Sequence, residues 1–95
     1  MAFFEYREAQ LHVEDVPIEE VAEHIGTPAY CYSAAALRHN FQTYARHFDA
    51  DSSLLCFAVK ANSNQRIIRE LGKLGAGADV VSEGELRRAL LAGIP

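Results

Sequence analysis

The second half of the chain alternates strand-like and helix-like segments, and this order limits the fold more than any other feature. Residues 54–59 form a continuous apolar run, LLCFAV, which predicts a strand covered on both faces. Residues 64–75 have the apolar spacing of a helix, residues 77–81 predict a second short strand, and another helix opens at Ser82. Two successive strand–helix units favour an α/β fold with a parallel sheet, either in a β/α barrel or in a doubly wound arrangement.

Local signals set the ends of these two helices. Asn64 is suited to cap the first, which Gly75 ends, and Ser82 has capping-box spacing with Glu85 at the start of the second. The apolar residues of each helix fall on one side. They are Ile67, Ile68, Leu71 and Leu74 in the first helix, and Leu86, Ala89 and Leu90 in the second.

The first half of the chain predicts more varied structure. Residues 2–13 alternate loosely between apolar and polar side chains, which suggests one or two short strands. A helix is expected between Pro17 and Gly26, residues 29–32 suggest a short strand, and Ser33 is a good N-cap for a longer helix. The apolar residues of that longer helix have helical spacing: Leu37, Phe41, Tyr44 and Phe48.

Composition and length narrow the possible classes of protein. The chain is 49% hydrophobic, enough for a core, and no stretch approaches membrane-spanning length. Nine scattered Lys and Arg residues face thirteen acids, so we expect neither a nucleic-acid nor a membrane partner. Cys31 and Cys56 lie in apolar runs, where buried reduced thiols are expected, as in a cytoplasmic protein. A barrel needs roughly 250 residues, so we expect these 95 residues to be an N-terminal part of a longer protein.

Lys60, directly after the first predicted strand, is the main candidate for chemistry. In a barrel it would lie at the mouth, where barrel enzymes keep their active sites. An amine held in an apolar environment loses its proton more easily and can attack an aldehyde. A solvated lysine after an edge strand is the alternative. Alternation along the strand puts small residues and Lys60 on one face and large residues on the other: Cys56, Ala58 and Lys60 against Leu55, Phe57 and Val59.

Two acidic residues accompany Lys60. Asp79 lies nineteen residues later, in the second predicted strand, where it would come near Lys60 at the mouth of a barrel. It could orient Lys60 or a cofactor, or it could form a structural hydrogen bond to a loop, and the pattern leaves both open. The spacing of Glu85 favours a helix-cap partner of Ser82 over a catalytic group.

Phosphate and metal binding are not predicted by other motifs. The glycines at 75 and 77 precede a strand, whereas phosphate-binding glycines follow one, so a helix end and a tight turn explain them better. The histidines have no ligand spacing, so no metal site is expected. They are His12, His24, His39 and His47.

Three segments resemble a known family. They are GTPAYCYS at 26–33, FAVKANSN at 57–64 and GAGADVVSEGEL at 75–86. In this order they resemble the diaminopimelate decarboxylases, which belong to the pyridoxal-phosphate-dependent decarboxylases with an alanine-racemase-like barrel. The resemblance implies that residues 33–95 are the start of a (β/α)8 TIM-type barrel, with its first two βα units. It also implies that residues 1–32 form a strand and helix segment that joins a C-terminal β-sandwich domain and leads into the barrel.

The same resemblance implies roles for four residues. Lys60 would bind the aldehyde carbon of pyridoxal 5'-phosphate covalently, and Asp79 would lie beside the cofactor and its lysine. Ala58 would be a small residue close to the cofactor ring, and Glu85 matches an acidic position near the active site. The cofactor would act as an electron sink when carbon dioxide departs, and the Lys60 amine could later take part in proton transfer.

The function implied is the decarboxylation of meso-2,6-diaminopimelate, a small amino-acid substrate, to L-lysine and carbon dioxide. A decarboxylase acting on ornithine, arginine or carboxynorspermidine stays open, as does a homologue that binds the cofactor without turnover. In the family the phosphate site, the acid at the pyridine nitrogen, the catalytic cysteine and the substrate arginine lie later in the chain. The active site is completed in a homodimer. We therefore expect these 95 residues to be inactive alone.

Overall fold

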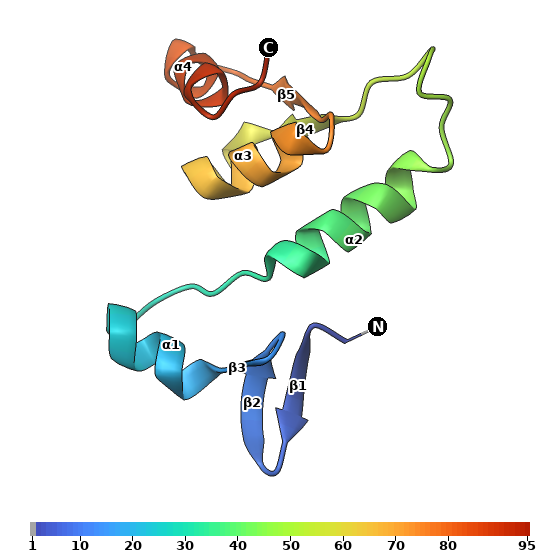
Figure 1. Ribbon diagram of the computed structural model, residues 1–95. Helices are drawn as coiled ribbons and strands as arrows, with labels where there is room; N and C mark the ends of the chain where they lie inside the picture. Colours follow the sequence, from blue (N-terminus) through green and yellow to red (C-terminus); the bar gives the residue numbers. More distant parts are fainter. Residues whose placement is uncertain (1) are drawn as a thin grey trace. The chain divides into compact units, whose positions relative to one another are not determined.

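A computed structural model describes residues 2–95 (Figure 1). The chain forms two compact units that divide between Ala36 and Leu37. The first unit contains a small antiparallel sheet and a helix, and the second contains two parallel strands with helices. Helix α2, Ala34–Ala45, begins in the first unit and continues in the second.

The first unit is built on three short antiparallel strands in the order β1-β2-β3. They are β1, Phe4–Arg7, β2, Gln10–Val13, and β3, Val16–Pro17, and helix α1, Ile18–Ile25, follows directly. The loose alternation of residues 2–13 predicts one or two strands, so the third is an addition. The predicted helix is confirmed, because Pro17 is its N-cap residue and Gly26 follows its last turn at a φ of 81°.

The turn between β1 and β2 has an unusual composition. Arg7 pairs with Gln10, so Glu8 and Ala9 form a two-residue loop, with φ angles of 51° and 68°. Two successive positive φ angles are typical of the type I′ turn, which normally contains Asn or Gly. Both residues carry a Cβ atom that is crowded in this conformation. The hairpin therefore forms against the local preference of its turn.

Arg7, the last residue of β1, contacts the turn between β2 and β3. Its guanidinium group contacts Glu5 at 2.8 Å and Asp15 at 3.2 Å, and it also donates a hydrogen bond to the carbonyl oxygen of Glu14 at 3.1 Å. The hydrogen bonds to Glu5 and then to Asp15 raise the pKa of Arg7 above its ordinary value. Because these groups are exposed, we expect only a small contribution to stability.

Glu14 connects the sheet with the start of α2. Its carboxylate accepts hydrogen bonds from Ser33 Oγ at 2.8 Å and from the amide of Ala35 at 3.3 Å. Ser33 Oγ in turn accepts from the amide of Ala36 at 3.0 Å. The predicted N-cap role of Ser33 is therefore confirmed, and a carboxylate adds to it at the positive end of the helix dipole.

The strand predicted at residues 29–32 is wrong. This segment is irregular and pairs with no other strand in the described part of the chain. Alternating apolar residues suit a strand only where a neighbour takes up the backbone hydrogen bonds and covers one face. Here Tyr30 is 88% exposed and Tyr32 is 51% exposed.

The second unit confirms the predicted order of strands and helices. It contains β4, Cys56–Ala58, a 3-10 turn at Val59–Ala61, helix α3, Gln65–Lys73, strand β5, Gly77–Asp79, and helix α4, Glu83–Leu91. Strands β4 and β5 pair in parallel, with Phe57 opposite Ala78. The protein is thus an α/β structure with the parallel pair that the alternation predicts. Both strands are shorter than predicted, and α2 ends before Phe48.

The apolar core lies between the strand pair and the helices. One cluster joins Val59 and Ile68, both fully buried, to the last turns of the chain, and the other joins α3 to Leu37 and Phe41 of α2. Phe57 packs against both clusters, and Ala78 packs against the first. The buried members are Val59, Ile68, Ala89, Ala92 and Ile94 in the first cluster, and Ile67, Leu71 and Ala76 in the second. Phe57 thus faces the helices, as strand alternation predicts.

The turn between β1 and β2 gives a stability test. Ala9→Gly is expected to raise the free energy of unfolding by about 0.5 kcal/mol, because glycine adopts a positive φ without the Cβ clash. Part of the gain is offset by the greater freedom of glycine in the unfolded chain. Denaturation of the full-length protein measures the change.

A matched control is Ala22→Gly, which makes the same substitution inside α1. There it is expected to lower the free energy of unfolding by about 1 kcal/mol, because helical φ angles suit alanine better. If both variants are destabilised alike, the positive φ of Ala9 is not the source of strain.

Candidate functional site

Lys60 lies in the middle of the 3-10 turn that follows β4, and its side chain is exposed. The strand alternation used to orient Lys60 therefore ends at Ala58, because the backbone leaves the extended conformation at Val59. Of the two alternatives that the sequence left open, an amine in an apolar environment and a solvated lysine, the described residues show Lys60 exposed. Val59 takes the buried position, at 0% exposure, and Lys60 points outward from the same turn.

A chain of local hydrogen bonds holds the segment that carries Lys60. The amide of Asn62 donates to the carbonyl oxygen of Val59 at 3.1 Å and closes the turn. Asn62 Oδ1 accepts from the amide of Asn64 at 3.1 Å, and Asn64 Oδ1 accepts from the amide of Arg66 at 2.9 Å. Short amide side chains favour such bonds to nearby backbone. The last bond confirms Asn64 as the N-cap of α3.

Asp79 ends β5 and lies directly opposite Ala58 in the parallel register. Paired residues of adjacent strands point to the same face of a sheet, so Asp79 and Ala58 are neighbours on the face away from Phe57. Asp79 is exposed, and Lys60 comes two positions after Ala58. The structure therefore brings Ala58, Asp79 and the turn of Lys60 to the carboxyl ends of the two strands, as the sequence predicts.

The rest of this face is lined by small residues. Cys56 pairs with Gly77 one step before Ala58 and Asp79. A Cβ atom on Gly77 would lie 2.9 Å from Cys56 Sγ and 3.1 Å from Leu54 Cδ2, so glycine is the residue that this close packing admits. Cys56 itself is exposed, which corrects the expectation of a buried thiol, because its face of the strand carries no cover within the described residues. Small side chains here leave room for a flat group beside Lys60.

Glu85 forms hydrogen bonds at the start of α4. Its Oε1 accepts a hydrogen bond from the amide of Val81 at 3.1 Å, and its own amide donates to Ser82 Oγ at 3.1 Å. This confirms the capping pair with Ser82, although the carboxylate reaches the residue before the cap rather than the cap itself. The bonds also restrain the loop that follows Asp79. A further role for Glu85 in chemistry stays a prediction.

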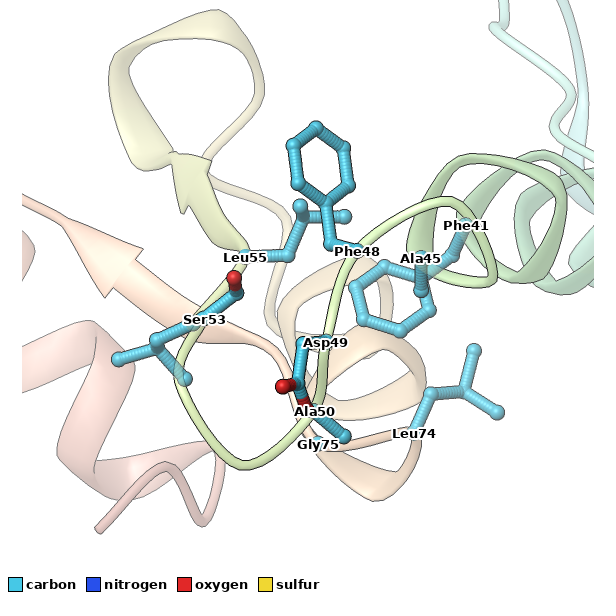
Figure 2. Close-up of a pocket in the computed structure, with 10 residues that line it drawn as sticks. Phe41, Ala45, Phe48, Asp49, Ala50, Ser53, Leu55, Leu74 and Gly75 are labelled. Carbon is cyan, nitrogen blue, oxygen red and sulfur yellow. The ribbon is translucent and has the colours of Figure 1, made fainter.

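The hollow drawn in Figure 2 lies away from these residues. It has a volume of about 250 Å³ and is lined by the end of α2, the following loop and the residues just before β4 and β5. The rings of Phe41 and Phe48 and the side chain of Leu55 line it. Gly75 lies at its edge with a φ of 99°, just after α3, which agrees with a helix end rather than a phosphate loop. This hollow is at the amino ends of the strands.

Two polar side chains near Lys60 were not identified from the sequence. Gln65 Nε2 donates a hydrogen bond to the carbonyl oxygen of Arg88 at 3.1 Å, and Arg88 Nη1 donates to the carbonyl oxygen of Ser63 at 3.3 Å. The partners are 23 and 25 residues apart in the chain. No local pattern could have revealed these contacts, because they form only when α3 and α4 pack together.

The described residues contain neither a cluster of metal ligands nor a helix that could span a membrane. Among residues 2–95, no three His, Cys, Asp or Glu side chains are grouped as a metal site would require. Over the same residues, no helix has the length and apolar character needed to cross a membrane.

Comparison with known proteins places these residues in a wider context. Residues 34–95 match the family model described as "Pyridoxal-dependent decarboxylase, pyridoxal binding domain". Curated diaminopimelate decarboxylases are similar over nearly all of the chain, with 46% identity for Aquifex aeolicus and 47% for Pseudomonas aeruginosa, each covering 98% of it. The chain spans only 22% of the length of these relatives.

Solved structures give the same picture. A crystal structure of an Aquifex aeolicus protein aligns with a TM-score of 0.90 and 46% identity, over 98% of this chain and 23% of that one. The diaminopimelate decarboxylase of M. jannaschii, solved in co-complex with L-lysine, aligns with a TM-score of 0.88 and 36% identity. That alignment covers 97% of this chain and 23% of the other.

Two substitutions at Glu85 separate the contribution of its hydrogen bond to stability from that of its charge. Glu85→Ala should lower the free energy of unfolding by about 1 kcal/mol, because the amide of Val81 loses its acceptor. Glu85→Gln keeps an acceptor oxygen and should be nearly as stable as the parent protein. Denaturation of the full-length protein measures both. Equal losses for the two variants would show that the carboxylate charge, and not the hydrogen bond, stabilises this loop.

Proposed function

Because the chain belongs to the pyridoxal-dependent decarboxylases, we propose that it is the N-terminal part of a diaminopimelate decarboxylase. Identities of 44–49% to curated enzymes of that name support the proposal, as does the alignment with the lysine-bound structure. The activity proposed for the whole protein is conversion of meso-2,6-diaminopimelate to L-lysine and carbon dioxide. The relatives named here favour this substrate over ornithine, arginine or carboxynorspermidine.

The architecture proposed follows from the strand pair. Units β4–α3 and β5–α4 are the first two of a (β/α)8 barrel, within a domain that includes residues 33–95. The small-residue face of Cys56, Ala58 and Gly77 then becomes interior, while Phe57 faces the outer helices. Residues 1–32 would associate with a C-terminal β-sandwich domain. The full-length protein would be a cytoplasmic homodimer.

The observation that carries the proposal is the position of Lys60. It is an exposed amine on a turn fixed by Val59 and by the cap of α3, at the carboxyl end of a parallel strand. In α/β barrels, chemistry takes place at this end of the strands. We propose that Lys60 Nζ is the group that would hold pyridoxal 5'-phosphate at its aldehyde carbon. When bound, this cofactor withdraws the electrons left by the departing carboxylate.

The other residues hold and orient. Asp79 would place its carboxylate near the Lys60 amine, at the carboxyl ends of the same two strands. Ala58, which pairs with Asp79 and lies two residues before Lys60, would leave space for the cofactor ring. Glu85, through its bond to Val81, would keep the loop after Asp79 in place. The Lys60 amine would also be the group that donates or accepts a proton at the reacting carbon.

Chemical labelling tests the role of Lys60. Borohydride reduction of the full-length protein with bound pyridoxal phosphate should leave a pyridoxyl group on the peptide that contains Lys60. Lys60→Ala should lower carbon dioxide release by roughly 10²–10⁴-fold, because both cofactor attachment and proton transfer are lost. Lys73→Ala, which removes an exposed lysine paired with Glu70 on α3, is the control and should retain activity. A label on another lysine, or near-normal turnover by Lys60→Ala, contradicts the proposal.

Asp79 can be tested by removing its charge alone. Asp79→Asn preserves the size of the side chain and should lower kcat/KM for meso-diaminopimelate by roughly 10- to 100-fold, because a charge beside the reacting nitrogen is lost. Asp51→Asn makes the same change in the exposed loop after α2 and should leave kcat/KM unchanged. Steady-state carbon dioxide release measures both. Matching values for the two variants would remove Asp79 from the site.

A further inference from the structure

Polar contacts to α4 hold the residues that follow Lys60. Arg88 Nη1 donates to the carbonyl oxygen of Ser63, three residues after Lys60, at 3.3 Å. Gln65 Nε2 donates to the carbonyl oxygen of Arg88 at 3.1 Å. The two bonds run in opposite directions between the same two segments. They connect the loop and the first residue of α3 with the last turn of α4.

An apolar contact to α4 holds the residue that precedes Lys60. Val59, the residue before Lys60, is fully buried in the cluster that contains Ala89 and Ala92. Ala89 is the next residue after Arg88. One turn of α4 therefore holds the chain both before and after Lys60.

Helix α4 also follows directly from the strand that carries Asp79. The capping bonds of Ser82 and Glu85 join the loop after β5, at Val81 and Ser82, to the first turn of this helix. A helix with a capped start transmits position along its length as a rigid element. Helix α4 thus connects the turn of Lys60 with the end of the strand that carries Asp79. Arg88 is the polar side chain that makes the connection.

We propose that Arg88 is a positioning residue that holds the Lys60 turn against α4 through the carbonyl oxygen of Ser63. This inference rests on the proposed function, because it gives Lys60 the cofactor. A single exposed hydrogen bond contributes little to global stability. Its effect falls on geometry, since a small displacement of a reacting group costs far more in rate than in stability.

The neighbouring arginine provides a matched control. Arg87 lies on the same helix and carries the same charge, but its guanidinium group contacts Glu83 at 3.5 Å, within α4 itself. Arg87→Ala and Arg88→Ala therefore remove the same side chain from adjacent positions. Only the second removes a bond to the segment after Lys60.

The first measurement uses the full-length protein without cofactor. Amide hydrogen exchange in the peptide spanning residues 59–64 should be about fivefold faster in Arg88→Ala, because one net hydrogen bond is lost from this segment. Arg87→Ala should exchange like the parent protein. Arg88→Lys, which retains a cationic donor, should recover part of the protection. This readout does not depend on any role of Lys60 in chemistry.

The second measurement uses the protein loaded with pyridoxal phosphate. Arg88→Ala should lower kcat by about tenfold with little change in KM, and should alter the visible absorbance of the lysine-bound cofactor, since a misplaced Lys60 affects reaction more than substrate binding. Arg87→Ala should match the parent protein in both. If Arg88→Ala does not fold, Gln65→Ala provides the second route, because it removes the reciprocal bond to the Arg88 carbonyl.

The outcomes separate the two proposals. Equal exchange and equal kinetics for the Arg87 and Arg88 variants would overturn the positioning role of Arg88. Faster exchange in Arg88→Ala together with a borohydride label on another lysine would support the positioning role of Arg88 and overturn the role of Lys60. Unchanged exchange in both Arg88→Ala and Gln65→Ala, with Lys60 labelled, would overturn the positioning role of Arg88 and leave the role of Lys60 intact.

Discussion

The burial of Val59 is the contact on which the candidate site depends. This side chain is fully buried in the cluster that includes Ile68 of α3 and Ala89 of α4, and burial of a valine contributes roughly 1.5–3 kcal/mol. The backbone leaves β4 and turns so that the Val59 side chain reaches this buried position. The same turn directs the next residue, Lys60, outward. The exposure of Lys60 is therefore a consequence of its neighbour's burial. The same contact joins both helices to the end of the strand.

The two faces of the strand pair have different tasks. Phe57 and Ala78 pack against the helices and hold the layers together. The opposite face carries short side chains, and a Cβ atom on Gly77 would collide with Cys56 Sγ and crowd Leu54. Asp79 ends this face beside Ala58. A sheet that is bulky on one side and nearly flat on the other can be supported by helices while leaving space at the reactive end.

Signals that act over a few residues were predicted well. The caps at Asn64 and Ser82 form the expected hydrogen bonds, and the parallel pairing follows from the alternation of strands and helices. Predictions that required a knowledge of neighbours were less accurate. Residues 29–32 have a strand-like pattern without a partner strand, and Cys56 has an apolar environment in sequence but an exposed one in space. An apolar run indicates that its residues favour burial, but the packing of the folded chain decides which of them are buried.

The sequence by itself determined the order of the elements, their caps and the residues able to carry chemistry, because periodicity and capping depend on near neighbours in the chain. It placed Lys60 and Asp79 at the ends of adjacent strands. The tertiary structure alone decided that Val59 is buried while Lys60 is exposed. It also decided that Gln65 and Arg88 meet across the two helices, since side chains more than twenty residues apart come together only when α3 and α4 pack.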